Sequence, residues 1–252
     1  MSGLFSLEGQ AALVTGANTG LGQAIAVGLA QAGADIIAVG RSAPDETAKM
    51  VADTGRKLHA ISADLGSTEP IPRVLFEAYA ATGRIDILVN NAGIIRRADS
   101  AEFTEADWDA VMDTNLKTAF FLSQAVGKRW IAEGRGGKII QVASMLSFQG
   151  GVRVPSYTAS KSGLAGLTKA LANEWAAKGI NVNAIAPGYF VSNNTEALRA
   201  DETRSRQIME RIPAGRWGQP EDLAGVAVFL ASKASDYMHG AVVPVDGGWL
   251  AR

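Results

Sequence analysis

The sequence predicts one α/β domain in which helices cover both faces of a parallel sheet. Short apolar runs rich in valine and isoleucine alternate with longer stretches of helical period along all 252 residues. Runs that are apolar on both faces are typical of buried parallel strands. Their alternation with amphipathic helices indicates repeated strand–helix–strand units. No repeat, low-complexity tract or Pro/Gly-rich linker interrupts this texture, so we expect residues 1–252 to form a single domain.

Seven apolar runs are predicted to be the strands of this sheet. They are residues 11–16, 34–40, 58–64, 85–93, 137–144, 180–188 and 241–248. The amphipathic segments between them include residues 21–33, 105–126 and 163–179. One long polar stretch, 189–219, departs from the alternation and directly follows a predicted strand. Insertions of this length at strand ends are commonly lids or binding loops, and we expect one here.

Composition excludes several classes of function. The formal net charge of −1 provides no field that would attract nucleic acid or an anionic membrane surface. The absence of cysteine excludes disulfides, thiolate metal sites and a cysteine nucleophile. His59 and His239 are far apart and lack metal-ligand spacing, so we expect no metal. The N-terminus "MSGLFSLEGQ" has no basic or apolar signal region, and no apolar run is long enough to span a bilayer. We therefore expect a cytoplasmic protein.

A glycine-rich loop follows the first predicted strand. In "VTGANTGLGQAIA" the glycines have the spacing G-x-x-x-G-x-G. Glycines at such a turn allow the backbone to approach a pyrophosphate, and the next helix directs its first N–H groups at the charge. This context predicts a dinucleotide cofactor. The loop residues expected to contact it are Gly16, Asn18, Thr19, Gly20, Leu21 and Gly22.

The end of the second predicted strand bears on the choice of coenzyme. An acid at this position favours NAD, whereas an arginine accommodates the 2′-phosphate of NADP. The chain has Arg41 there, and its nearest acid, Asp45, comes later. Arg41 argues for NADP, but Thr19 in the glycine loop supplies no second cation. These residues leave the coenzyme open.

The stretch "PSYTASKSG" places a tyrosine and a lysine four residues apart. On a helix, Tyr157 and Lys161 therefore face the same way. Tyrosine is a poor base at pH 7 because its ordinary pKa is near 10, and a neighbouring cation favours the phenolate. The spacing predicts that Lys161 tunes Tyr157 for proton transfer. Ser144 ends the 137–144 strand and could polarise a substrate carbonyl, with Ser147 as the second candidate.

Together these motifs resemble the short-chain dehydrogenase/reductases. The residues that carry the resemblance are Thr15–Gly22, Asn90–Gly93, Asn115, Ser144, Tyr157, Lys161 and Pro187–Gly188, in chain order. The segments "ASMLSFQGG", "RIPAGRWG" and "DGGWLAR" resemble a subgroup that acts on deoxy-sugar acids in pectin and uronate breakdown. The resemblance implies a Rossmann-type doubly wound sheet of seven parallel strands, usually in a homotetramer. It also implies reversible hydride transfer between a nicotinamide and a secondary alcohol or ketone.

The resemblance assigns roles to individual residues. The catalytic set it implies is Asn115, Ser144, Tyr157 and Lys161. Asn115 is expected to distort its helix and anchor a water, and Lys161 to hold the nicotinamide ribose. Further cofactor contacts are expected at Arg41, Asp64, Leu65, Asn91, Ala92, Gly93, Tyr157, Lys161, Pro187 and Gly188. Asn90 is expected to support this pocket. NAD(H) is favoured because the subgroup mostly uses it, and NADP(H) stays open.

A sugar-acid substrate would present a carboxylate, which arginine matches with two parallel hydrogen bonds. Arg97 and Arg153 are the candidates, with Arg96 beside them, and Gln149 is expected to contact a hydroxyl. Trp249 is expected to pack at a subunit interface. Two alternatives remain open. One is a 3-oxoacyl-carrier-protein reductase, which would need a basic docking surface, and the other is a nicotinamide-binding protein without turnover.

Overall fold

The computed structural model describes residues 3–252 and contains the predicted seven-stranded parallel sheet. The strand order is β3-β2-β1-β4-β5-β6-β7. The strands are β1 (Ala11–Thr15), β2 (Asp35–Gly40), β3 (Leu58–Ser62), β4 (Ile87–Asn90), β5 (Gly137–Val142), β6 (Ile180–Pro187) and β7 (Val242–Val245). Each strand lies within the apolar run predicted for it, and the fold class is confirmed.

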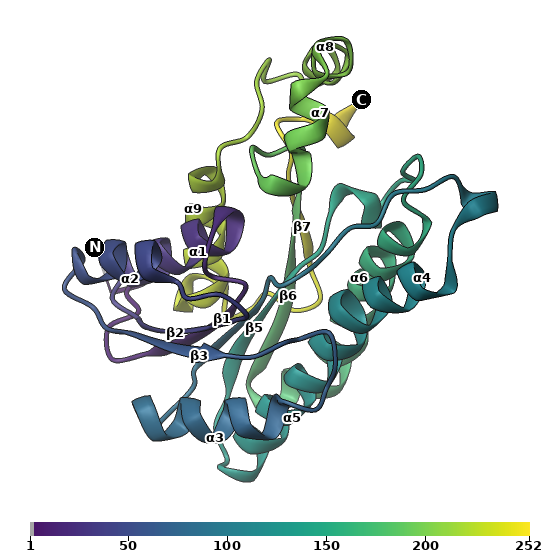
Figure 1. The fold of residues 1–252 in the computed structure, drawn as a ribbon. Helices are drawn as coiled ribbons and strands as arrows, with labels where there is room; N and C mark the ends of the chain where they lie inside the picture. The colour runs from purple at the N-terminus through teal and green to yellow at the C-terminus, as the bar shows by residue number, and fades with distance from the viewer. Residues whose placement is uncertain (1–2) are drawn as a thin grey trace.

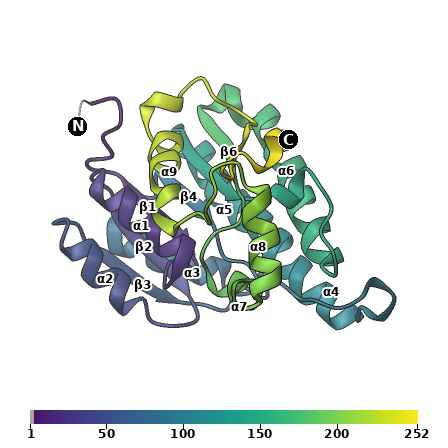
Figure 2. The same ribbon diagram turned by 90° about the horizontal axis from the view of Figure 1, so that it is seen from above.

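Two layers of helices cover the sheet (Figures 1 and 2). One layer contains α1 (Gly20–Gln31), α2 (Asp45–Ala52) and α9 (Ala224–Ala231), and the other contains α3 (Ile71–Thr82), α5 (Thr118–Ala132) and α6 (Pro155–Trp175). In β1, Ala12 and Val14 pack into the first core, whereas Leu13 packs into the second. Successive strand residues point to opposite faces, so both must be apolar, as the sequence pattern indicated.

Two regions depart from regular secondary structure. The predicted 105–126 helix is divided into α4 (Glu105–Met112), a π-helical turn at Asp113–Lys117, and α5. The 189–219 segment folds into a 3₁₀ turn (Asn193–Thr195), α7 (Glu196–Ala200) and α8 (Glu202–Arg211). Figure 1 shows α7, α8 and the C-terminus grouped beyond one end of the sheet. The remaining 3₁₀ turns are Ser100–Glu102, Met145–Ser147, Ala176–Lys178, Pro220–Leu223, Lys233–Ser235 and Trp249–Ala251.

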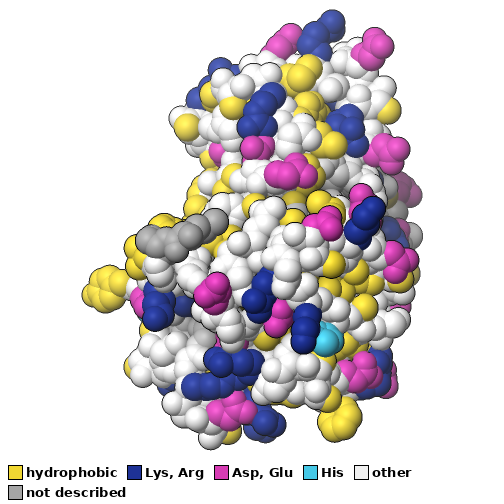
Figure 3. Space-filling view, turned by 90° about the vertical axis from the view of Figure 1, so that its left-hand side faces the viewer, with side chains coloured by type: hydrophobic (Ala, Val, Ile, Leu, Met, Phe, Trp, Pro, Cys, Tyr) yellow, Lys and Arg dark blue, Asp and Glu magenta, His cyan; other side chains and the backbone are white. Residues whose placement is uncertain are grey.

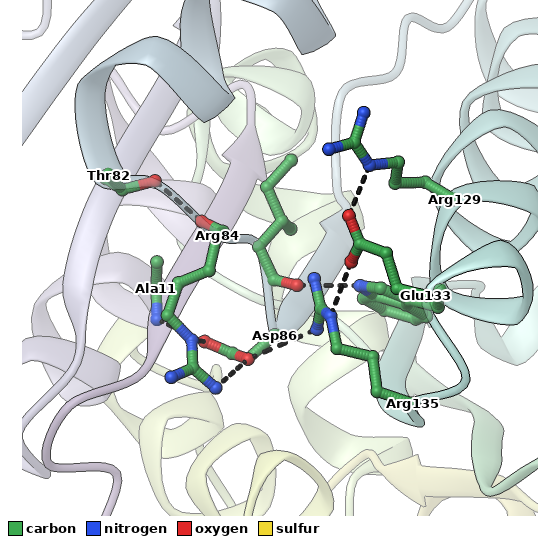
Figure 4. A network of polar contacts seen from close by, with 9 residues as sticks. Ala11, Thr82, Arg84, Asp86, Arg129, Glu133 and Arg135 are labelled. Atoms are coloured by element: carbon green, nitrogen blue, oxygen red, sulfur yellow. Dashed lines mark hydrogen bonds and ion pairs between the residues drawn. The ribbon is translucent and has the colours of Figure 1, made fainter.

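A polar network joins β1 and β4 where these strands begin (Figure 4). The buried Asp86 carboxylate accepts from the Ala11 backbone N–H at 2.9 Å. Arg84 donates to both Asp86 oxygens, at 2.8 and 2.7 Å, and Arg135 approaches at 3.4 Å. Arg135 also pairs with Glu133 at 2.7 Å. The network stabilises the end of the sheet at which β1 and β4 begin. A site can therefore form at the opposite end, where the strands finish.

The surface carries charges of both signs. Figure 3 shows lysine and arginine interspersed with aspartate and glutamate on one face of the molecule. Within residues 3–252, no helix combines the length and apolar character that crossing a membrane would require. Over the same residues, histidine, aspartate and glutamate side chains nowhere gather in a group of three or more that could hold a metal ion.

Candidate active site

The site is built where β1, β4, β5 and β6 end. Between β1 and β4 the strand order reverses its direction, and in doubly wound sheets ligands bind in the crevice at this switch point. The Asn91 side chain bridges the two strand ends, donating to the Thr15 and Gly16 carbonyl oxygens at 2.9 and 3.1 Å. The Thr15 hydroxyl accepts the backbone N–H groups of Asn91 and Ala92 at 3.0 and 2.9 Å. These bonds hold the glycine loop and the NNAG turn (residues 90–93) side by side.

The glycine loop leaves room for a ligand against its backbone. Gly16 and Gly20 have φ values of +65° and +57°, in the left-handed region that glycine adopts without strain. A Cβ atom on Gly22 would lie 2.1 Å from the Gly16 carbonyl oxygen, so this close approach requires glycine. Thr19 is the N-cap residue of α1, and its side chain makes no capping hydrogen bond. The first N–H groups of α1 therefore face the cradle that a pyrophosphate would fill.

A pocket of about 270 Å³ adjoins the loop. It lies at the ends of β2 and β3 and is lined by Ala17, Asn18, Ala38, Val39, Gly40, Ser42, Ala43, Pro44, Ala60, Ile61 and Ser62. Asn18 donates to the Ser42 hydroxyl at 2.8 Å across one wall, and Arg41 is exposed beside it. Its place next to the phosphate cradle fits the nucleoside end of a dinucleotide.

The other predicted cofactor residues lie at the same end of the sheet, where the strands finish. The Asp64 carboxylate accepts from the Gly66 N–H at 2.9 Å and so fixes its own turn, while Leu65 is buried in the core. Pro187 ends β6, and the next residue, Gly188, donates to the Val245 carbonyl at 2.9 Å. A Cβ atom on Gly188 would lie 2.7 Å from Asp246, so a side chain has no room there.

Three elements bring the predicted catalytic side chains together. Tyr157 and Lys161 lie one turn apart on α6, and Ser144 caps the 3₁₀ turn that follows β5. The Ser144 hydroxyl accepts from the Leu146 N–H at 3.1 Å. Ser147, the alternative candidate, donates to the Lys161 carbonyl oxygen at 2.7 Å. Ser147 therefore holds the loop against α6.

Asn115 lies in the π-helical turn and is 1% exposed. Its amide oxygen accepts from the Ile94 N–H at 2.8 Å, and its NH₂ group donates to the Ile94 carbonyl at 2.9 Å. A second donor contact reaches the Ser160 hydroxyl at 3.3 Å. Asn115 thus clamps the NNAG loop to the helix that carries Tyr157. π-turns within α-helices are frequent at functional sites.

The Lys161 ammonium is buried, with only 4% of the residue exposed. It donates to the Val142 carbonyl oxygen at 2.6 Å and lies 5.5 Å from the centre of the Tyr157 ring. Burial lowers the pKa of Lys161 to about 8, because the apolar surroundings penalise the charged form. At neutral pH the group keeps its proton.

The electrostatics of Tyr157 differ from the sequence-based expectation. Burial raises the pKa of the Tyr157 phenol, while hydrogen bonding with Ser144 and the positive charge of Arg97 act in the opposite direction. The net shift is upward. Arg97 is the cation that acts on the Tyr157 pKa here, while the Lys161 ammonium donates to the Val142 carbonyl. In this state the phenol is protonated at neutral pH and is a proton donor.

The three candidate substrate arginines differ in whether an acidic side chain already pairs with the guanidinium group. Arg153 has a φ of +63° and forms an ion pair with Asp99 at 2.9 Å, with both side chains exposed. Arg96 pairs with Asp107 at 3.1 Å on the surface. Arg97 instead extends toward the 189–219 segment and donates to the Asn194 carbonyl at 2.9 Å. Of the three, Arg97 is the arginine whose charge acts on Tyr157.

Two contacts were missed by sequence reasoning. Asn194 meets Arg97 through its backbone carbonyl, which no residue pattern could reveal. Trp249 was expected at a subunit interface, but it is 5% exposed within its own chain, where it packs with the 189–219 segment. Its indole N–H donates to the Gln149 side-chain oxygen at 3.2 Å. The aromatic ring therefore needs no second subunit to be buried.

Comparisons with known proteins agree with this geometry. A family model described as Enoyl-(Acyl carrier protein) reductase matches residues 16–250. A 2-dehydro-3-deoxy-D-gluconate 5-dehydrogenase from Escherichia coli is 62% identical over 248 residues, which cover 98% of each chain. A solved structure from Agrobacterium tumefaciens, provisionally described as a 2-deoxy-D-gluconate 3-dehydrogenase with bound NADP, is 63% identical with a TM-score of 0.92 over 99% of both chains.

A second solved structure shows the same fold with lower identity. This protein from Beutenbergia cavernae, provisionally described as an NAD(P)-dependent gluconate 5-dehydrogenase with NADP at low occupancy, is 53% identical. Its TM-score is 0.95, and the match covers 99% of this chain and 100% of that one. The present protein is therefore an NAD(P)-dependent oxidoreductase that acts on a CH–OH group. More narrowly, it belongs to the short-chain dehydrogenase/reductase family.

Proposed function

We propose that the protein reversibly transfers a hydride between a nicotinamide and a ketone or secondary alcohol of a deoxy-sugar acid, as a 2-dehydro-3-deoxy-D-gluconate 5-dehydrogenase. The observation that carries the proposal is the meeting of Ser144, after β5, with Tyr157 and Lys161 of α6, within range of the positive charge of Arg97. Arg97 supplies a cation that matches a substrate carboxylate. The 62% identity to the Escherichia coli enzyme of that name supports the same substrate class.

Each catalytic side chain has a distinct task in this proposal. When bound, the nicotinamide supplies the hydride for reduction or accepts it in oxidation. The Ser144 hydroxyl donates a hydrogen bond to the substrate oxygen and polarises the carbonyl. Tyr157 gives its proton to that oxygen during reduction and removes it during oxidation. Lys161 is buried one helical turn from Tyr157, and Asn115 holds the loop at Ile94. We also assign to Asn115 the anchoring of a water for proton relay, which the family resemblance implies.

The cofactor would be held at three places. The glycine loop and the start of α1 receive the pyrophosphate, and the pocket at the ends of β2 and β3 receives the adenosine. Lys161 holds the nicotinamide ribose. The sequence favoured NAD(H), and this preference is not confirmed because both solved relatives contain NADP. Arg41, exposed beside the adenosine pocket, supports use of NADP(H) as well.

A homotetramer is part of the proposal. Support comes from apolar side chains left exposed on neighbouring helices: Trp108 on α4 is 40% exposed, and Phe121 and Ile131 on α5 are 39% and 38% exposed. Large apolar side chains that stay exposed on a folded chain can contribute to an association surface. Light scattering of the purified protein tests this directly, and a monomeric mass contradicts it.

A substrate panel tests the proposed function. Keto-sugar acids of five and six carbons are assayed in parallel with NADH and NADPH, and acetoacetyl thioesters are assayed as the alternative substrate class. We expect reduction of a 3-deoxy-2,5-diketo-hexonate, which carries the ketone at C5, and little turnover of thioesters, because Arg97 favours a small carboxylate-bearing substrate. Turnover of the thioester alone identifies a 3-oxoacyl reductase instead. Cofactor binding without turnover of any carbonyl compound indicates a non-catalytic binding protein.

A further inference from the structure

The chain end and the 189–219 segment form one packed unit. After β7, the Arg252 guanidinium donates to the carbonyl oxygens of Glu210 and Arg211, at 2.7 and 3.1 Å, where α8 ends. The Asp246 carboxylate accepts from the backbone N–H groups of Gly248 and Leu250, both at 2.9 Å. Asp246 thus fixes the turn that carries Trp249. Figure 2 shows the C-terminus near one end of α8.

Trp249 joins this unit to the loop that carries Ser144. Its ring packs edge-on to Tyr189 with 4.8 Å between centroids, and the Arg211 guanidinium lies 4.0 Å from the ring centroid. Its indole N–H points the other way and donates to Gln149 Oε1 at 3.2 Å. Gln149 follows Ser144 by five residues, and its backbone N–H donates to the Met145 carbonyl at 3.3 Å. The chain end therefore holds the catalytic loop.

The Trp249 contact fixes how the Gln149 amide is turned. An indole nitrogen only donates, so the acceptor facing it must be the amide oxygen. This leaves the NH₂ group of Gln149 as the free end. That group makes no hydrogen bond to any residue in the range 3–252, although the side chain is only partly exposed. A half-buried donor without a protein partner, on the loop that begins at Ser144, is available to a ligand.

We propose that Trp249 is a positioning residue that presents the Gln149 amide NH₂ as a hydrogen-bond donor to a substrate oxygen. The inference rests on the proposed function only in taking the substrate to be a polyoxygenated acid. Because the Gln149 oxygen is already used by Trp249, the amide selects an oxygen lone pair, on a carboxylate, ketone or hydroxyl group. The Gln149 oxygen keeps a second lone pair, but the NH₂ group is the end that has no partner among residues 3–252.

A matched pair of tryptophan substitutions tests the positioning role. Trp217 lies in the same apolar cluster, packs edge-on to Tyr189 at 5.4 Å, and its buried indole N–H has no partner among the residues of the described chain. Trp249→Phe and Trp217→Phe therefore remove equal bulk, but only the first removes a hydrogen bond. We expect Trp249→Phe to raise KM about tenfold with kcat nearly unchanged, and Trp217→Phe to alter KM less than about twofold. Equal effects of the two variants, or an unchanged KM in Trp249→Phe, overturn the proposal.

Substitutions at Gln149 test which end of the amide meets the substrate. Gln149→Glu keeps an acceptor for Trp249 but replaces the donor with a carboxylate oxygen. We expect its KM to rise at least as much as in Gln149→Leu, about tenfold or more. In a double-mutant cycle, Trp249→Phe should add little to Gln149→Leu, since both remove the same contact. A Gln149→Glu enzyme with unchanged KM, or fully additive effects in the cycle, contradicts the proposal.

Two features of the experiment distinguish a failure of this inference from a failure of the proposed function. The cycle uses whichever carbonyl compound the wild type turns over best, so failure of sugar acids alone does not remove the test. A substrate-free readout is hydrogen exchange of the Trp249 indole N–H in ¹⁵N-labelled protein, with the Trp217 indole as internal reference. Exchange at Trp249 should accelerate several-fold in Gln149→Leu and stay unchanged at Trp217. Unchanged exchange at Trp249 contradicts the hydrogen bond on which the inference depends.

Discussion

Lys161 is buried and Tyr157 is partly buried, and the charged forms of both are disfavoured. Burial raises the pKa of the phenol and lowers the pKa of the ammonium to about 8. At neutral pH Tyr157 is therefore a neutral hydroxyl and Lys161 is protonated. This state is suited to giving a proton to a ketone oxygen, the reductive direction. Oxidation needs the phenol to lose its proton, so we expect oxidation to be faster at alkaline pH than at neutral pH.

The lowered pKa of Lys161 makes a prediction for stability. Below pH 8 the folded protein carries the full cost of a buried ammonium; between about pH 8 and 10 the folded state loses this proton before the unfolded state does. The unfolded state then binds more protons, so stability rises with pH in this window. In urea unfolding without cofactor, the wild type should gain on the order of 2 kcal/mol relative to Lys161→Met from pH 8 to 10.

The control for this measurement is Lys169→Met, which removes an exposed lysine of the same helix. Its free energy of unfolding should follow that of the wild type at every pH. The upward shift of the Tyr157 pKa acts in the other direction above pH 10, so the comparison ends there. Parallel curves for the wild type and Lys161→Met between pH 8 and 10 would show that the ammonium is not desolvated.

At the scale of elements, two irregular pieces of backbone form the site. The π-turn at Asp113–Lys117 turns Asn115 toward Ile94, and the glycine loop brings Gly22 against the Gly16 carbonyl. The sequence predicted the loop because its glycines have a characteristic spacing. It could not place the π-turn from periodicity, because the apolar residues on either side fit one continuous helix. Only the resemblance implied a distortion at Asn115.

Gly22→Ala tests the close approach inside the glycine loop. The new Cβ atom would meet the Gly16 carbonyl oxygen at 2.1 Å, so the loop must move. We expect NADPH affinity to fall at least about tenfold and stability to fall by about 1–3 kcal/mol, measured by fluorescence titration and urea unfolding. Gly166→Ala in α6 is the control, because a Cβ there meets no heavy atom within 4 Å. It should bind NADPH normally and gain about 0.5–1 kcal/mol.

At the scale of the whole molecule, the stabilising Asp86 network and the proposed active site lie at opposite ends of the strands. The Asp86 network ties the beginnings of β1 and β4, whereas the proposed catalytic residues lie beyond the strand ends. The apolar runs predicted this sheet because burial on both faces leaves a pattern that is readable along the chain. Contacts such as Arg97 with Asn194, or Gln149 with Trp249, left no such pattern. Each joins residues that are far apart in sequence through a single hydrogen bond.

Because the Asp86 network and the site lie at opposite ends of the strands, we predict that a mutation in the network affects stability alone. Asp86→Ala leaves the buried Ala11 N–H and the half-exposed Arg84 guanidinium without their acceptor. We expect a loss on the order of 2 kcal/mol in the free energy of unfolding, with kcat and KM unchanged at temperatures where the protein is folded. Glu77→Ala, which breaks the exposed pair with Arg73, should cost less than about 1 kcal/mol. A reduced kcat in folded Asp86→Ala would show that the two ends of the sheet are coupled.

The central claim is that the Tyr157 hydroxyl transfers the proton at the reacting oxygen. The most direct measurement is turnover and NADPH affinity of Tyr157→Phe, which removes only that hydroxyl and keeps the ring. We predict that kcat falls by about a hundred- to ten-thousandfold, while the Kd for NADPH changes less than about threefold. A variant that turns over the sugar acid at near the wild-type rate contradicts the account.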